Sequence, residues 1–244
     1  MDWTPPENLD LQTILNEAKD DGLAGRYELA LSKHIWFHRN ALRLQPSIYG
    51  VRLTFGIAYW KTLTEHYPPA LTALLEVRNS AEKSIRSYLV SGDTLRDAFH
   101  EFEAINKLFD ETARTCDLFT WLDEFQPDVA RQLYRIAQSA LIRNRDWKMC
   151  GKFIDPKAMY EWSLKRYRNK KDLAEDPKYG INMRAFGEKC FANEIAILVA
   201  LLYLNGRDEE SEQLAMDALK EFENEDFASL LKESLTGVVA TPWP

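Results

Sequence analysis

The chain has 244 residues, of which 45% are hydrophobic and 12% aromatic, so it is long enough to bury a sizeable core. Its formal net charge of -7 and pI near 5.3 argue against broad nucleic-acid binding, which needs a basic surface. Three widely separated cysteines give no disulfide framework and no Cys-x-x-Cys metal pair, and they indicate a reduced, cytoplasmic protein. The longest apolar run, residues 195–204, is too short to span a bilayer, so we expect no membrane association.

The first half of the chain reads as four successive helices. Apolar residues recur at helical spacing, and the sustained alternation typical of strands is missing. Turn and breaker residues predict helices over residues 9–21, 25–46 and 47–67, and Pro68 begins a fourth that runs towards Gly92. The third of these helices is apolar on nearly all sides, which indicates that it is buried.

The second half continues in the same way. Asp93 and Asp110 are expected to cap two helices, and Pro127 begins another. Four further helices are expected to begin after residues 144–146, at Asp155-Pro156, at Asn182 and at residue 207. A short last helix is expected over residues 226–235. Because helices joined by short loops pack as antiparallel neighbours, we predict a single all-α domain over residues 1–244, with about twelve helices. We expect the tail, residues 236–244, to pack in an ordered way.

Two stretches resemble tetratricopeptide repeats. The first has Gly25, Tyr27 and Ala30 at the spacing of the second helix of a repeat, and it ends at Pro46, about one helical turn late. The second covers residues 195–219, where small and apolar residues occur at the spacing of a tight helical hairpin. This resemblance implies that the helical hairpins stack as a superhelix.

The resemblance also implies a concave groove that binds a partner without catalysis. Gly56 is expected to face the hairpin partner of its helix, and Trp60 and Lys61 then lie about 40° and 140° away from it. Aromatic and cationic side chains would give a groove suited to a peptide-like partner, including an acidic segment. The residues predicted to line the groove are Trp60, Lys61, His100, Lys107, Arg131 and Tyr134.

A pair of histidines raises an alternative. His34 and His38 are four residues apart and share a helix face, so they could bind a metal together. No third ligand is near in sequence, so we predict no metal and no cofactor, and we interpret the pair as packing residues. The alternative is a small enzyme or ligand-binding protein whose site lies between helices and draws on five residues: His34, His38, His100, Glu101 and Glu103.

A basic run supports a third reading. Residues 165–171 contain five basic residues in seven, with Tyr167 among them, as in surfaces that hold phosphate and stack a base. The alternative is a solvated helix end whose cations complement the helix dipole, and no second basic stretch supports nucleic-acid binding. No hydrolase, phosphate-loop or dinucleotide motif is present, so we predict a protein that is not an enzyme.

Overall fold

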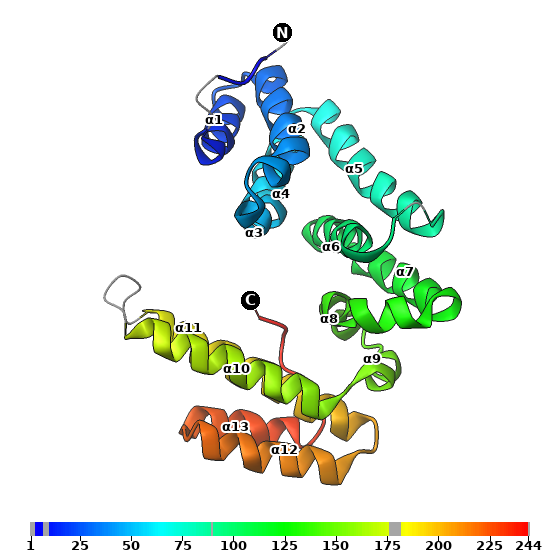
Figure 1. The fold of residues 1–244 in the computed structure, drawn as a ribbon, viewed down its shortest axis with the longest axis vertical. Coiled ribbons are helices and arrows are strands. Elements are labelled where there is room, and N and C mark those ends of the chain that lie inside the picture. The colour runs from blue at the N-terminus through cyan, green and yellow to red at the C-terminus, as the bar shows by residue number, and fades with distance from the viewer. Residues whose placement is uncertain (1–2, 7–9, 89, 176–181, 244) are drawn as a thin grey trace. The chain divides into compact units, whose positions relative to one another are not determined.

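The computed structural model describes residues 3–6, 10–88, 90–175 and 182–243. All regular structure among them is helical, which confirms the predicted all-α fold (Figure 1). The helices number twelve in this part of the chain when the continuous segments between Tyr49 and Thr64 are counted as one and the short 3-10 turn before them is left out. The chain divides into two compact units, Met1–Glu124 and Phe125–Pro244, and each is described by itself. The predicted single domain and stacked superhelix stay predictions.

The first unit is built from helical hairpins. Its neighbouring helices α1 and α2 pack together, as do α4 and α5, and α5 and α6. In chain order its elements are α1 (Leu11–Leu23), α2 (Tyr27–Leu44), the 3-10 turn η1 (Pro46–Ile48), α3 (Tyr49–Val51), the π-helical turn η2 (Arg52–Gly56), α4 (Ile57–Thr64), α5 (Pro68–Arg86), α6 (Gly92–Leu108) and α7 (Thr112–Phe125).

The core of this unit forms where α2, α4, α5 and α6 meet. Trp60 is its largest member and is 1% exposed, and its indole N–H donates to the carbonyl oxygen of Ala70 at 3.1 Å. Gly56 faces α2, because a Cβ added to it would lie 3.2 Å from Cε1 of Phe37, whereas it was expected to face the following helix, its predicted hairpin partner. Trp60 is one α-helical turn beyond Gly56, so it also points into the core.

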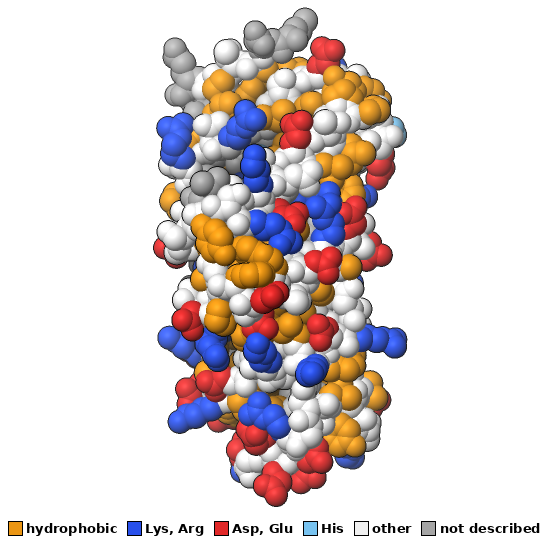
Figure 2. Space-filling model, turned by 90° about the vertical axis from the view of Figure 1, so that its right-hand side faces the viewer, with side chains coloured by type: hydrophobic (Ala, Val, Ile, Leu, Met, Phe, Trp, Pro, Cys, Tyr) orange, Lys and Arg blue, Asp and Glu red, His pale blue; other side chains and the backbone are white. Residues whose placement is uncertain are grey.

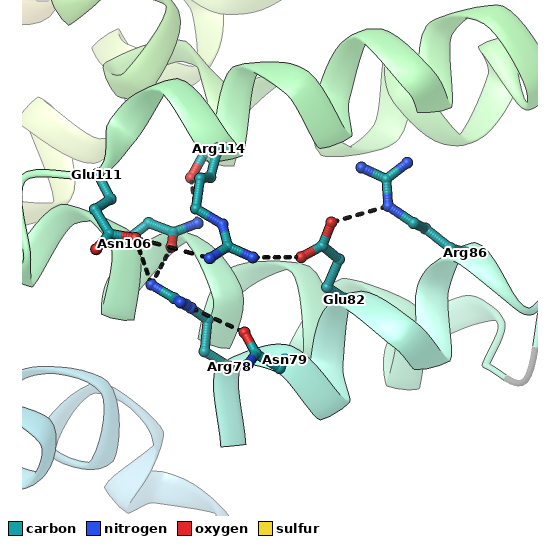
Figure 3. A network of polar contacts seen from close by, with 8 residues as sticks. Arg78, Asn79, Glu82, Arg86, Asn106, Glu111 and Arg114 are labelled. Atoms are coloured by element: carbon teal, nitrogen blue, oxygen red, sulfur yellow. Dashed lines mark hydrogen bonds and ion pairs between the residues drawn. The ribbon is translucent and has the colours of Figure 1, made fainter. Parts of the chain in front are cut away.

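A polar network fastens α5 to α6 and α7 (Figure 3). Arg78 is 4% exposed, and its Nη1 donates to Oε2 of Glu111 at 2.6 Å. Asn106 is fully buried, and its Nδ2 donates to Oγ1 of Thr115 at 3.1 Å. Glu82 joins two further arginines, one from α5 and one from α7. These bonds give the buried polar groups partners, without which their burial would be costly.

The second unit is organised around α11. This helix packs against α10, α12 and α13, and the residues of its apolar run from Ile195 to Leu202 are buried. The elements of the unit are α8 (Pro127–Arg143), α9 (Trp147–Phe153), α10 (Pro156–Ala174), α11 (Asn182–Leu204), α12 (Asp208–Glu221) and α13 (Glu225–Ser234). Among the described residues, no helix is long and apolar enough to cross a membrane.

The tail after α13 returns to α11. The backbone N–H of Trp243 donates to Oδ1 of Asn193 at 3.0 Å, and the Trp243 ring packs edge-on against Phe186 at 5.3 Å. Lys189 Nζ lies 4.1 Å from the centre of the same ring. The tail therefore packs on its own unit, as far as Trp243; Pro244 lies outside the described residues.

Several helix boundaries lie where they were predicted, and most of the others differ by one to three residues. Asp155 caps α10, since its side chain accepts from the N–H of Ala158 at 3.0 Å, as the Asp-Pro pair predicted. Asp93 was expected to be a cap, but it lies in the first turn of α6, where Ser91 has the N-cap position. Asp110 is one residue too early, because α7 begins at Thr112. The predicted start at Leu9 lies outside the described residues.

Gly151 gives a test of the packing between α9 and α11. A Cβ at Gly151 would lie 2.0 Å from Oδ1 of Asn205. The Asn205 amide donates to the carbonyl oxygens of Trp147 and Leu201, at 3.0 and 2.8 Å. We expect Gly151→Ala to lower the free energy of unfolding by about 2 kcal/mol in urea titrations, because the new methyl group displaces a bonded amide.

Gly50 is the matched control for this substitution. It lies in α3, and a Cβ there would meet nothing within 4 Å. Gly50→Ala should therefore stabilise the protein by about 0.5 kcal/mol, through the better helix propensity of alanine. Similar effects at the two glycines would contradict the close approach described for Gly151.

Candidate functional site

The site begins with an irregular turn in the middle of a helix. Residues Arg52–Gly56 form a π-helical turn between α3 and α4. A π turn bonds residue i to i+5 and is rare, and such turns occur often at functional sites because they redirect a side chain. Here the first residue of the turn is Arg52, which is 9% exposed although it carries a charge.

Arg52 reaches one residue on α2 and one on α6. Its Nε donates to the carbonyl oxygen of His38 at 2.9 Å, and its Nη2 donates to Oε2 of Glu101. Nε2 of His38 lies 2.8 Å from the same carboxylate oxygen. We call His38, Arg52 and Glu101 the charged cluster.

The proton on His38 can be assigned from these contacts. Nε2 of His38 is 2.8 Å from both Oε2 of Glu101 and Nη2 of Arg52. A guanidinium nitrogen only donates, whereas a carboxylate oxygen only accepts. The stronger arrangement has the Nε2–H of His38 donating to Glu101, and this leaves Nδ1 as the acceptor nitrogen of a neutral imidazole.

The ionisation of the cluster follows from its surroundings. Burial lowers the pKa of His38, so the ring is held neutral. Burial alone would raise the pKa of Glu101, but the hydrogen bond from His38 and the charge of Arg52 outweigh it, and the pKa lies below its usual range. The cluster therefore contains one cation, one anion and one neutral ring at neutral pH.

Such a cluster is a poor way to stabilise a fold. Removing both charges from water costs several kcal/mol, which their attraction offsets only with good geometry, and apolar replacements are often as stable. The side chains of Arg52 and Glu101 are only 11% and 15% exposed. The buried ion pair on this π turn is therefore expected to contribute little net stability.

The cluster borders a cavity of about 480 Å³ in the first unit. We call it the α5 cavity, because one face of α5 runs along it. That face carries small side chains where large ones would fill the space, and five of its residues are Ala73, Val77, Ser80, Ala81 and Ser84. From the first to the last is eleven residues, or about 16 Å of helix. The volume lies in the range of ligand sites.

Two further charges lie at the cavity without ion-pair partners. Arg39 on α2 and Glu76 on α5 both line it, and both are exposed. Neither makes an ion pair or side-chain hydrogen bond with another described residue. With the charged cluster they give the cavity two cations and two anions, so its walls are balanced in charge.

Four of the predicted groove residues belong to the first unit, and among them only Trp60 lines the α5 cavity. Trp60 is in the core, with one edge on the α5 cavity. His100 is half-buried, and its Nδ1 is 3.1 Å from the hydroxyl of Tyr49. Lys61 pairs with Glu65 on its own helix at 3.6 Å. Lys107 is exposed on α6 and does not line the cavity.

The other two predicted groove residues belong to the second unit. Arg131 is exposed on α8. Tyr134 is 2% exposed, and its ring stacks on Phe153 at 5.6 Å, so a partner at the surface cannot contact it. The groove predicted from all six residues stays a prediction.

The two histidines of α2 play different parts. The His34 ring stacks on Trp60 at 6.0 Å, and neither of its nitrogens has a hydrogen-bond partner among the described residues. His38 turns its edge to the same indole and joins the charged cluster. Glu103 is buried on α6 away from the cavity lining. In the described part of the chain, no group of three or more metal-ligating side chains could hold an ion.

The basic run is mostly engaged within the second unit. Tyr167 is buried and stacks on Phe191 at 4.9 Å, so it cannot stack a base. Arg166 pairs with Glu194 at 2.5 Å, and Arg168 pairs with both oxygens of Glu221 at 2.8 Å. Figure 2 shows positive and negative side chains interspersed over one face of the molecule. These contacts fit a solvated helix surface better than a nucleic-acid site.

Comparison with known proteins gives no relative. No family model matches the chain, and no curated protein or solved structure matches it. The function has to be inferred from the α5 cavity and its charged cluster.

Proposed function

We propose that this protein is a non-catalytic binding protein whose first unit holds a peptide segment in the α5 cavity. The observation that supports this most is the charged cluster, built on a π turn at the wall of a cavity of about 480 Å³. The cavity follows α5 for about 16 Å, which is the length of about five extended residues. An elongated site with polar groups on both sides suits a peptide.

The proposed partner is a peptide, as the sequence predicted, but it binds in the α5 cavity and not in the predicted groove. Of the six residues first expected to bind it, only Trp60 lines the α5 cavity. The balance of Arg39 and Arg52 against Glu76 and Glu101 favours a neutral segment over an acidic one. A tetratricopeptide-like stack of the hairpins and a cytoplasmic location remain part of the proposal. The first rests on the sequence pattern around Gly25 and in residues 195–219, and the second on the small number and wide separation of the cysteines.

A phage-displayed library of random 12-residue peptides tests this function. We expect the wild-type protein to enrich peptides whose binding is lost in Ser80→Phe, since Ser80 is an exposed residue of the cavity wall and the ring would fill the space. Ser87→Phe is the matched control, because Ser87 is exposed at the end of the same helix and does not line the cavity. Failure to enrich any peptide, or equal loss in the two variants, would reject the proposal.

One observation favours a second candidate, an enzyme that transfers protons at His38. Its Nε2 is held by Glu101 at 2.8 Å, and its pKa is lowered, as for a general base that is oriented by a carboxylate. Mass spectrometry of the enriched peptides after incubation distinguishes the two. Cleaved or modified peptides with the wild type, and unchanged ones with His38→Gln, would favour the enzyme.

A further inference from the structure

One face of α5 is left open at the α5 cavity. The buried residues of this helix are Ala70, Leu74, Arg78, Ala81 and Ile85. Four residues of a neighbouring face line the cavity, and none of them is buried: Ala73, Val77, Ser80 and Ser84. At about 100° per residue, these four lie within about 60° of one another around the helix axis. We call them the open stripe.

The spacing of the open stripe is that of a helix that packs along another helix. Its successive members are separated by four, three and four residues, as are the contact positions of paired helices. Alanine and serine side chains are small, so they let the axis of a second helix come close to that of α5. The open stripe therefore has the pattern of a contact face whose partner helix is not part of the first unit.

The wall of the cavity is also better suited to a helix than to an extended segment. Apart from Val90, every residue that lines it belongs to a helix or to the π turn. The backbone groups of a helix are bonded within it, so the wall gives an extended segment few backbone partners. Buried peptide groups without partners are costly. A helix bonds its own backbone groups and avoids this cost.

The charges of the cavity are separated by element. Arg39 lies on α2 and Arg52 on η2, whereas Glu76 lies on α5 and Glu101 on α6. Helix α2 packs against η2, and α5 packs against α6. One pair of neighbouring elements thus contributes both cations of the cavity, and the other pair contributes both anions.

Three of these four charges have capacity left for a ligand. Arg39 and Glu76 make no ion pair with another described residue. Arg52 is only 9% exposed, and its Nη1 bonds to no other residue in the described part of the chain. Buried polar groups are almost always hydrogen-bonded, so an open donor of a buried cation at a cavity points to a ligand with an acceptor.

We infer that the α5 cavity binds one face of an amphipathic α-helix of a partner protein. The apolar residues of that helix pack on the open stripe. Its acidic flank faces Arg39 and Arg52, and its basic flank faces Glu76. About three turns, or eleven residues, cover the 16 Å of the stripe. This inference rests on the proposed peptide site, and it names the conformation and the charge pattern of the bound segment.

The test uses three designed peptides of about 16 residues, each with leucines at i, i+4, i+7 and i+11. The mixed peptide has glutamates on one flank of the leucine face and lysines on the other. The acidic peptide has glutamates on both flanks, and the basic peptide has lysines on both. Binding of the fluorescein-labelled peptides is measured by fluorescence anisotropy.

We expect the wild-type protein to bind the mixed peptide about fivefold more tightly than the acidic or the basic peptide. Each of the other two peptides sets one flank against a charge of its own sign. The mixed peptide matches the cavity in one of its two directions, so the comparison does not require the direction of the bound helix to be known. Ser80→Phe should abolish binding of all three.

Two single substitutions should change the preference. Glu76→Arg puts cations on both sides of the cavity, so the acidic peptide should bind most tightly. Arg39→Glu should make the basic peptide bind most tightly. Both side chains are exposed, so folding should be retained. Lys83→Glu is the control, because Lys83 is exposed on α5 and does not line the cavity. It should leave the mixed peptide preferred.

A fourth peptide tests the conformation of the bound segment. It is the mixed peptide with proline at a central position of the face opposite the leucines. Proline breaks the helix and leaves the leucines and the charged side chains in place. We expect binding to weaken at least about tenfold. Equal binding of the mixed peptide with and without proline would overturn the helix.

The outcomes separate this inference from the proposed function. Binding of library peptides that is lost in Ser80→Phe, without binding of any designed helix, would overturn the helix and support the peptide site. Equal binding of the mixed, acidic and basic peptides, or a preference that is unchanged in both Glu76→Arg and Arg39→Glu, would overturn the charge pattern and with it this inference. No binding of library or designed peptides would overturn both the inference and the proposed function.

Discussion

Glu101→Ala is expected to lower the free energy of unfolding by about 3 kcal/mol, as measured by urea denaturation. The substitution leaves the guanidinium of Arg52 without its anion at a position where the side chain is only 11% exposed. An uncompensated buried charge is among the most destabilising changes that a single substitution can make. His38 loses the acceptor of its Nε2 proton at the same time.

The double variant Arg52→Met, Glu101→Leu should recover this loss, or exceed the wild type. Its apolar side chains keep similar volumes and remove both charges from the interior, so neither ion has to leave water. Peptide binding should be lost together with the charged cluster. The double variant would then lose peptide binding without losing stability, as expected if the proposed role of the cluster is recognition.

The exposed pair Lys61–Glu65 supplies the control. Its side chains are 34% and 58% exposed, and Nζ and Oε1 are 3.6 Å apart. Glu65→Ala should change the free energy of unfolding by no more than about 0.5 kcal/mol, because water screens the pair. If Glu101→Ala were as mild as Glu65→Ala, or the double variant less stable than the single one, the described burial of the cluster would be wrong.

Acid should destabilise the first unit through His34. Burial lowers its pKa from 6.5 to about 3, with a smaller contribution from His38, and the ring has no hydrogen-bond partner among the described residues. As the pH falls below 6.5, His34 therefore binds a proton in the unfolded chain but not in the folded protein. The stabilising contribution is complete above pH 6.5 and is lost as the pH falls towards 3. Between pH 7 and 4.5 the loss amounts to about 2.5 kcal/mol.

His34→Phe is the variant that isolates this effect. A phenyl ring keeps the stacking on Trp60 and cannot take up a proton. The free energy of unfolding, measured by urea denaturation, should fall between pH 7 and pH 4.5 by about 2.5 kcal/mol less in His34→Phe than in the wild type. The remaining difference belongs to other groups, His38 among them, whose pKa is also lowered. His66→Phe, at an exposed histidine, is the control, and an unchanged pH dependence in His34→Phe would show that His34 is not sealed from water.

Helical periodicity was sufficient to predict the secondary structure. Breakers such as Pro68 and Pro127 mark helix starts by local chemistry that does not depend on packing, so the predicted number and order of helices is right. The partner of Gly56 was not predicted correctly, because a small residue allows close packing on either neighbouring helix, and Gly56 faces α2 and not the helix that follows. Trp60 shares that face, which is why it lies in the core and only borders the cavity.

The charged cluster could not be found in the same way. Projection at 100° per residue assumes a regular α-helix, and the π turn that begins at Arg52 departs from that rule without a sequence signal of its own. Glu76 and Arg39 look like solvated surface residues until the fold brings α2 and α5 to one cavity. The i, i+4 spacing of His34 and His38 is visible in the sequence, but their different surroundings depend on α4 and α6.

The π turn also has a genetic consequence. It holds one residue more than a regular helical turn, so the loss of a single codon there would leave an unbroken α-helix. Without that codon, the segment before the turn would rotate by about 100° relative to α4, and Arg52 would leave Glu101. Such a deletion would keep the helical scaffold without the charged cluster. One triplet at this place thus decides whether the charged cluster exists.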